Sequence, residues 1–184
     1  MAEAARGRLR RRRAVIAVDT NILVYAHRVD TPFHGAAKRC VAEQIEGRAT
    51  WAIPWPCVHE FLAVVTRPRI FDPPTPLARA LDQVDAWLAS PSLVLLNEDA
   101  GYWEELRTVL GAGHIVGGHV HDARIAALCV LHGVRELWTA DRDFTRFPYV
   151  LVRNPLIDHV SEGRASYGRR RRVGRGRTAV ARAR

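Results

Sequence analysis

Five short apolar runs, separated by longer amphipathic segments, limit most strongly what this 184-residue chain can fold into. Each run is too short for a buried helix and is typical of a strand that is buried on both faces. The runs lie at 14–18, 50–54, 92–97, 135–140 and 149–152. Strands that alternate with helices in this way form a mainly parallel sheet with helices on both sides. The sequence therefore predicts a single α/β domain.

Between these runs, apolar residues recur at the three- and four-residue spacing of a helix. Helices are expected at 21–28, 33–47, 56–66, 76–88, 100–110 and 121–133. Pro56 suits the first turn of its helix, and Thr75 is a candidate cap for the helix that begins at Pro76. The segment 111–120 is expected to be a glycine-rich loop.

Charge is distributed unevenly, because the ends are basic and the centre is mildly acidic. Residues 1–13 hold six Arg and one Glu, and residues 161–184 hold nine Arg and one Glu. Residues 14–160 carry a net charge of −4. Basic arms bind polyanions such as nucleic acid, but they are equally typical of disordered ends without a role. We therefore expect a folded domain at 14–156, between a basic arm at 1–13 and an Arg-rich tail at 157–184.

The sequence also bears on where the protein works. No apolar run approaches the roughly 18–20 residues of a membrane span, and the basic start lacks a signal-peptide pattern. Cys40, Cys57 and Cys129 are odd in number, far apart and set among apolar residues. This pattern indicates reduced thiols in the core rather than disulfides or a zinc site. A cytoplasmic protein without membrane association is expected.

Acidic residues stand where predicted strands end or predicted helices begin. Asp19 follows the first apolar run, Asp141 follows the fourth, and Asp143 comes two residues later. Glu60 and Asp122 lie near the starts of helices. Each acid alone fits a helix cap, a favourable helix dipole, a turn or the surface. Because ligands of parallel sheets gather at the carboxyl ends of the strands, we expect these acids to lie together.

Two of these acids should point toward the core. Asp122 shares a helix face with Ile125, Ala126 and Cys129, and Glu60 lies at the edge of the apolar face of its helix. Carboxylates at the rim of a core need a partner, since pairs of them at 4 Å repel by about 4 kcal/mol at an effective dielectric of 20. An all-oxygen site suits Mg²⁺ or Mn²⁺, and such an ion can activate water against a phosphodiester.

Four motifs resemble those of the PIN-domain ribonucleases and, more narrowly, the VapC-type toxins of type II toxin–antitoxin systems. The motifs are AVDTNILVYA, WPCVHEFLAVVTRPRIF, VHDARIAALC and LWTADRDFTRFP, in the order and at the spacing of that family. The resemblance covers about residues 15–156. It implies a three-layer α/β/α sandwich and an Mg²⁺- or Mn²⁺-dependent endoribonuclease, the toxin of a VapBC-type pair. It also implies an RNA substrate, a VapB-like antitoxin and a homodimer.

The resemblance further implies roles for individual residues. An acidic quartet would consist of Asp19, Glu60, Asp122 and Asp141. Asp19, Asp122 and Asp141 would bind the metal, while Glu60 would orient the attacking water or act as a base. Asp143 competes with Asp141 for the fourth place.

Other residues would support that quartet. Thr20, Asn21 and Thr139 would orient the acidic side chains by hydrogen bonds. The arginines that flank the motif acids are candidates for contacts to RNA phosphates, or else exposed or salt-bridged side chains: Arg124, Arg142 and Arg146.

Two alternatives remain. His119 and His121 beside Asp122 suggest a zinc site, but their spacing suits a loop and no third soft ligand follows, so solvated histidines are expected. The alternative from another class is a nucleic-acid-binding protein with a vestigial PIN site that works through its basic ends.

Overall fold

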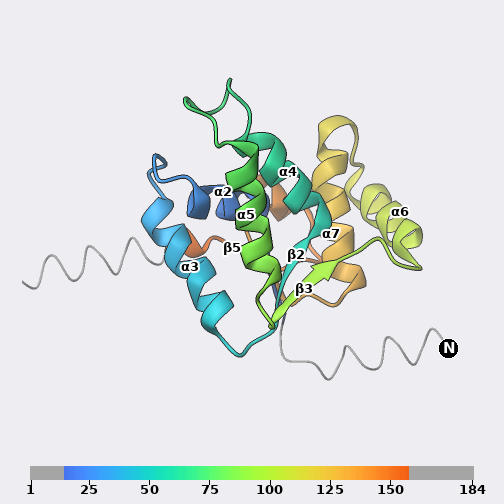
Figure 1. The fold of residues 1–184 in the computed structure, drawn as a ribbon. Helices are drawn as coiled ribbons and strands as arrows, with labels where there is room; N and C mark the ends of the chain where they lie inside the picture. The colour runs from blue at the N-terminus through green and yellow to red at the C-terminus, as the bar shows by residue number, and fades with distance from the viewer. Residues whose placement is uncertain (1–14, 158–184) are drawn as a thin grey trace, which may run out of the picture.

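In the computed structural model, which describes residues 15–157, a five-stranded sheet forms the centre of the described chain (Figure 1). The strands are β1 (Ile16–Val18), β2 (Trp51–Pro54), β3 (Leu93–Leu96), β4 (Glu136–Trp138) and β5 (Val152–Arg153). They lie in the order β3-β2-β1-β4-β5, and every neighbouring pair is parallel. The carboxyl ends of β1, β2 and β4 therefore meet at one edge, with β1 in the middle.

Helices connect the strands along the chain. The α-helices are α2 (Thr20–His27), α3 (His34–Glu46), α4 (Trp55–Val65), α5 (Leu77–Leu88), α6 (Tyr102–Gly113) and α7 (Val120–Leu131). Two 3-10 turns, η1 (Gly117–His119) and η2 (Arg142–Arg146), precede α7 and follow β4. None of the helices in this part of the chain is long and apolar enough to cross a membrane.

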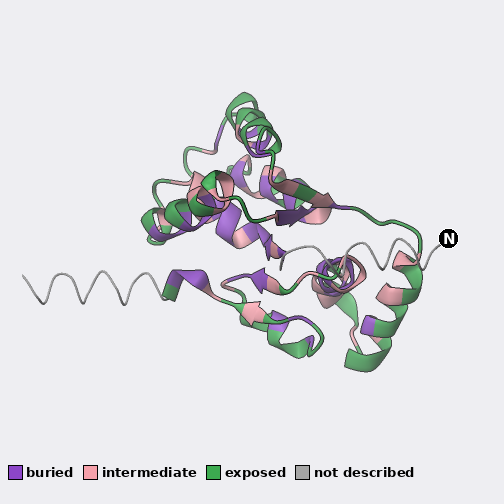
Figure 2. Cartoon of the chain, turned by 90° about the horizontal axis from the view of Figure 1, so that it is seen from below, coloured by how far each residue is buried: buried purple, intermediate pink, exposed green. Residues whose placement is uncertain are grey.

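The central strands β1, β2 and β4 are mostly buried, whereas the edge strands β3 and β5 are partly exposed (Figure 2). All four residues of β2, Trp51–Pro54, are buried. Since successive side chains of a strand point to opposite faces, both faces of β2 must be covered. The predicted α/β fold, a three-layer sandwich around a parallel sheet, is confirmed.

Most boundaries lie within two residues of those expected from the sequence, and two differ by three residues. Helix α6 continues to Gly113, and η1 occupies part of the remaining segment, so the loop expected at 111–120 is shorter. The last strand was expected at 149–152, but β5 begins only at Val152. A turn precedes it, because the backbone amide of Val150 donates to the carbonyl of Phe147.

The prediction that Thr75 caps α5 is wrong. Pro76 occupies the cap position, and no side-chain hydrogen bond caps this helix. The Thr75 hydroxyl instead lies 3.2 Å from both His27 Nε2 and Arg28 Nη1. It therefore links the end of α2 to the segment before α5.

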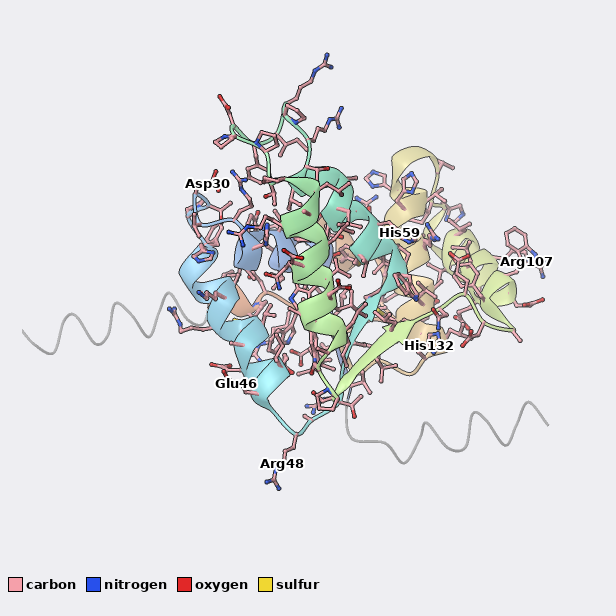
Figure 3. All side chains as sticks on the ribbon, viewed as in Figure 1. Asp30, Glu46, Arg48, His59, Arg107 and His132 are labelled. Carbon is pink, nitrogen blue, oxygen red and sulfur yellow. The ribbon has the colours of Figure 1, made fainter. Side chains whose placement is uncertain are left out.

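The hydrophobic core contains the three cysteines, Cys40, Cys57 and Cys129, which are buried and free as the sequence predicted. Burial raises the pKa of the Cys40 thiol to about 11. Charged side chains such as Arg48 and Arg107 point away from the core (Figure 3). The basic arm expected at 1–13 and the tail expected at 157–184 lie outside the described residues, apart from Ile157.

An aromatic cluster joins α4 to its neighbours α2 and α5. Phe61 of α4 is fully buried, with its ring centroid 4.8 Å from that of Trp87 and 5.3 Å from that of His27, both edge-on. Such contacts add to the free energy gained by burying the ring. Phe61 therefore fixes the helix that carries Glu60.

Replacing this ring should destabilise the fold strongly. We expect Phe61→Ala to lower the free energy of unfolding by about 3–5 kcal/mol, because the change leaves a cavity in a core that cannot collapse fully. Urea denaturation followed by circular dichroism would measure this loss. Leu81→Ala, at an exposed position of α5, is the control and should cost less than about 1 kcal/mol. Equal costs for the two variants would contradict the role given to Phe61.

Candidate metal centre

Asp19 lies at the junction between the central strand and the helix that follows it. Its backbone is extended, and its Oδ1 accepts a hydrogen bond of 2.8 Å from the amide of Thr20, so it caps α2. The residue is only 3% exposed. Asp19 is thus both a helix cap and a buried carboxylate at the carboxyl edge of the sheet.

Asn21 and Thr139 hold the other oxygen of this carboxylate. Asn21 Nδ2 donates to Asp19 Oδ2 at 2.6 Å, and the Thr139 hydroxyl donates to the same oxygen at 2.7 Å. Asn21 Nδ2 also lies 2.8 Å from Thr139 Oγ1, and Asn21 Oδ1 accepts from the amide of Ala140. These bonds tie the end of β1 to the end of β4 and fix the direction of the Asp19 side chain.

Glu60 joins this network through Thr20. The Thr20 hydroxyl donates to Glu60 Oε2 at 2.7 Å, although the two residues lie on α2 and α4. Glu60 itself is an exposed residue. The structure therefore brings Glu60 of α4 together with Asp19, Thr20, Asn21 and Thr139, which lie at the ends of β1 and β4.

Burial makes ionisation of Asp19 costly. Its pKa is raised from 3.8 to about 6, mainly because the carboxylate is desolvated, and the nearby charge of Glu60 adds to the rise. Hydrogen bonds from Thr139 and Thr20 act in the opposite direction. Among residues 15–157, the donors that reach Asp19 are uncharged, and they include the Cys57 thiol, whose sulfur lies 3.6 Å from Oδ1. A cation bound at this carboxylate would offset the cost of desolvation.

A second group of ligand atoms lies at the start of α7. His119 Nδ1 is 3.3 Å from Asp122 Oδ2 and 4.0 Å from Asp143 Oδ2. One ligand atom from each of these three residues lies within 4.8 Å of the others. Helix α7 contacts both α4 and η2, so the elements that carry Glu60, Asp122 and Asp143 adjoin one another (Figure 1).

Asp141 and Asp143 have different surroundings, although they are two residues apart. Asp141 is exposed, and its Oδ1 accepts from the amide of Asp143 at 2.8 Å, so it caps η2. Asp143 Oδ2 instead faces His119. Of the two acids, Asp143 is the one that the structure groups with Asp122.

The three candidate arginines differ in their partners. Arg124 Nε donates to Glu98, and Arg146 Nη2 donates to Asp143 Oδ1 at 2.9 Å. Arg142 is exposed at the start of η2. Arg146 thus lies beside Asp143, while Arg124 pairs with Glu98, which precedes α6.

The sequence predicts that His119 is a solvated loop histidine, whereas the structure groups it with Asp122 and Asp143. His121, the second histidine of the same motif, is exposed and is not part of this group. The signal was present in the sequence, because His119 precedes Asp122 by three residues, a distance that one helical turn spans. That Asp143 belongs to the same group could not be predicted, because the sequence does not show where η2 lies relative to α7.

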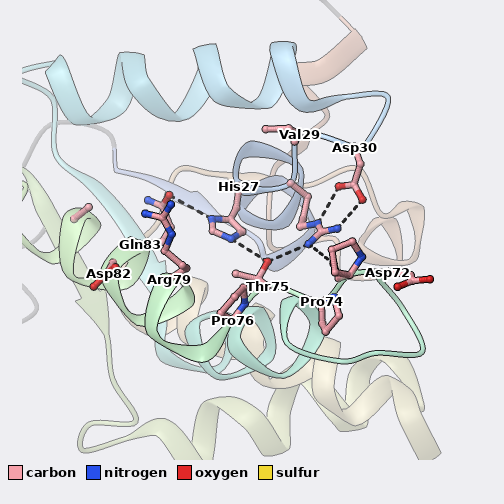
Figure 4. Close-up of a pocket in the computed structure, with 13 residues that line it drawn as sticks. His27, Val29, Asp30, Asp72, Pro74, Thr75, Pro76, Arg79, Asp82 and Gln83 are labelled. Atoms are coloured by element: carbon pink, nitrogen blue, oxygen red, sulfur yellow. Dashed lines mark hydrogen bonds and ion pairs between the residues drawn. The ribbon is translucent and has the colours of Figure 1, made fainter.

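A separate cavity of about 690 Å³ lies at the other end of α2 (Figure 4). His27, Arg28 and Thr75 meet there, and the side chain of Arg28 pairs with Asp30 at 2.6 Å. Arg28 also lies over the ring of Phe71, 4.2 Å from its centroid. None of the motif acids lines this cavity, so the cavity is distinct from Asp19 and Glu60 and from the group of His119, Asp122 and Asp143.

The donor set fits a divalent cation. Carboxylate oxygens are the ligands preferred by Mg²⁺ and Mn²⁺, and such ions keep several waters in sites that are open to solvent. Side-chain exposures of 24% for Asp122 and 50% for Asp143 leave room for those waters. Asp122 and Asp143 share one group of ligand atoms, while Asp19 and Glu60 are linked to each other through Thr20.

Comparison with known proteins identifies the class of this fold. The sequence model of the PIN domain matches residues 16–149, and the chain belongs to the PIN domain family. Ribonuclease VapC48 of Mycobacterium tuberculosis is 31% identical over 138 residues, which make up 75% of this chain and 95% of that protein. Ribonuclease VapC43 of the same organism is 32% identical over 142 residues, or 77% and 96% of the two chains.

Solved structures share the fold at lower identity. VapC20 of Mycobacterium tuberculosis, described as a sarcin-ricin loop cleaving toxin, has a TM-score of 0.57 at 20% identity. The similarity covers 76% of this chain and 99% of VapC20. VapBC2 from Rickettsia felis, bound to a DNA fragment from its promoter, gives a TM-score of 0.55 at 22% identity over 76% and 98%. At these identities the comparison shows a common fold.

The raised pKa of Asp19 predicts a pH dependence of stability in the metal-free protein. Between pH 3.8 and pH about 6, Asp19 is protonated in the folded chain and deprotonated in the unfolded chain. The stability contributed by protonated Asp19 is therefore fully present below pH 3.8, and it is lost as the pH rises through about 6. Relative to Asp19→Asn, the wild type should lose on the order of 3 kcal/mol between about pH 4 and about pH 7.5.

Urea denaturation of both proteins in EDTA across this range would measure the difference. Asp85→Asn, at an exposed position of α5, controls for the removal of a carboxylate and should give a difference from the wild type that is nearly independent of pH. A flat difference between wild type and Asp19→Asn would contradict the cost of ionising this buried group.

Proposed function

We propose that this chain is a divalent-metal-dependent endoribonuclease and the toxin of a VapBC-type toxin–antitoxin pair. The observation that carries the proposal is the gathering of Asp19, Glu60 and Thr139 at one sheet edge, in a PIN-family chain whose curated relatives are ribonucleases. Within the described part of the chain, the buried Asp19 accepts hydrogen bonds from uncharged donors alone, which supports a cation at this edge. RNA is the substrate class by relationship to those proteins.

The metal ligands in this proposal are Asp19, Asp122 and one acid of η2. Asp143 is favoured for the last place because its Oδ2 faces the Asp122 group, whereas Asp141 caps η2. When bound, Mg²⁺ or Mn²⁺ supplies positive charge that offsets the developing charge on the phosphate and makes water more acidic. The protein supplies the direction of each ligand through Thr20, Asn21 and Thr139.

Glu60 is proposed as the base. Its Oε2 is held by the Thr20 hydroxyl, so Oε1 is left to accept a proton from the attacking water. The water oxygen bonds to phosphorus while one P–O ester bond breaks, and the departing oxygen takes up a proton. Arg142 and Arg146, which lie on η2 beside Asp143, are proposed to contact phosphate oxygens of the RNA.

A small VapB-like antitoxin is the proposed partner. Structures with the same fold include VapBC2 from Rickettsia felis and VapBC from Salmonella typhimurium, both bound to DNA. A short reading frame beside the gene for this chain is the first place to look for such a partner. Homodimerisation, a role for the basic ends and a cytoplasmic location stay predictions.

RNA cleavage should depend on metal and on Asp19. We expect the full chain to cleave bulk RNA in Mg²⁺ or Mn²⁺, and EDTA to abolish cleavage. Asp19→Asn should slow cleavage by about 100-fold or more, since a catalytic metal contributes several kcal/mol to the barrier. Gel analysis of RNA fragments would measure the rates, and Asp85→Asn is the matched control. Binding of RNA without cleavage at any metal concentration would favour the vestigial-site alternative.

The two acids of η2 should differ in their effect on metal affinity. Asp143→Asn should weaken Mn²⁺ binding about tenfold or more, because it removes an oxygen that faces Asp122. Asp141→Asn should change the affinity less than about threefold, because its carboxylate caps a turn. Isothermal titration calorimetry on the two variants would measure both constants. The reverse order would assign the fourth place to Asp141.

A further inference from the structure

We propose that His119 is a direct ligand of the divalent ion at this site, and that its imidazole makes the site prefer Mn²⁺ over Mg²⁺. The inference rests on the proposed metal-dependent nuclease site and adds a nitrogen donor to its carboxylates. It begins with the position of His119 at the end of η1, one turn before Asp122. Its Nδ1 faces carboxylate oxygens of two different elements, α7 and η2.

The distances suit a shared cation. Ligand atoms bound at about 2.0–2.2 Å in octahedral geometry lie about 3 Å apart when they are neighbours. His119 Nδ1 and Asp122 Oδ2 are 3.3 Å apart, and Asp143 Oδ2 lies 4.0 Å from the same nitrogen. Small side-chain rotations would therefore bring all three atoms to one ion.

The surrounding contacts leave these atoms available. His119 occupies the cap position of α7, but its side chain makes no capping hydrogen bond. Arg146 takes Oδ1 of Asp143, so Oδ2 is the oxygen turned toward His119. The side chains of His119 and Asp143 are 45% and 50% exposed, so an ion and its waters can reach them.

The local sequence explains how the imidazole comes to this place. Gly117 has a positive φ of 62°, which residues with a Cβ rarely adopt, and it opens η1. The left-handed residue turns the chain after α6, and His119 follows two residues later at the start of α7. The glycines of this segment, which match no phosphate-binding loop, thus have a role in placing His119.

The chemistry of the donor set indicates the metal. Carboxylates and water suit Mg²⁺ and Mn²⁺ alike, whereas imidazole favours first-row transition ions. An imidazole in place of a fourth oxygen therefore raises the affinity for Mn²⁺ relative to Mg²⁺. His121 serves as an internal control, because it lies two residues away on the exposed side of α7 and outside the group.

Electron spin-echo spectroscopy of Mn²⁺ bound to the full chain tests this directly. An imidazole nitrogen bonded to Mn²⁺ modulates the echo through its ¹⁴N nucleus. We expect this modulation in the wild type and in His121→Ala, and its loss in His119→Ala and in His119→Gln. Bound Mn²⁺ without ¹⁴N modulation in the wild type would overturn the proposal without any variant having to fold. Modulation that survives in His119→Ala would also overturn it.

Metal competition gives a second readout. His119→Ala should weaken Mn²⁺ binding about tenfold or more and Mg²⁺ binding less than about threefold. Equal losses for the two ions, or no loss, would contradict the preference. RNA cleavage measured on the same samples separates the two proposals. Cleavage without ¹⁴N modulation would support the nuclease and exclude His119 as a metal ligand. Modulation without cleavage would support His119 as a metal ligand and contradict the nuclease. A wild type that binds no Mn²⁺ at all would overturn both.

Discussion

The burial of one carboxylate, Asp19, is the constraint on which the rest of the structure depends. It ends the central strand and begins α2, so it cannot move toward solvent without disturbing both elements. Hydrogen bonds from Thr20, Asn21 and Thr139 reduce the cost of its burial, but the raised pKa shows that they do not remove it. The protein therefore maintains an unfavourable negative charge at the place where a cation is proposed to bind. Under the proposed function, the local loss of stability would be offset by binding of the cation.

Much of this arrangement could be predicted from the sequence. Short apolar runs between helical segments predicted the parallel sheet, because only strands buried on both faces are so continuously apolar. In such a sheet Asp19 and Thr139, which follow different strands, had to meet at one edge. The motif resemblance added the family, which the comparison with known proteins confirmed.

The finer details of the site depended on geometry that the sequence does not display. Whether Asp141 or Asp143 turns toward Asp122 is decided by η2, whose first hydrogen bond takes up the Asp141 carboxylate. The place of His119 depends on a left-handed glycine two residues earlier. Arg124 is paired with Glu98, a residue from the loop before α6 whose position no local pattern could give. The boundary of β5 shifted for a similar reason, because a turn uses part of the apolar run.

The hydrogen bond between Asn21 and Thr139 has a consequence for the life of the protein in the cell. These residues are 118 positions apart, and the candidate acids lie before α2, on α4, on α7 and on η2. A ribosome must therefore make nearly the whole domain before the carboxylates can be assembled. A chain that ends before Thr139 lacks the hydrogen bonds that hold Asp19. Under the proposed function, a nascent chain would be harmless to the RNA of the ribosome that makes it. A single cut between β1 and β4 that lets the two parts separate would inactivate the finished protein.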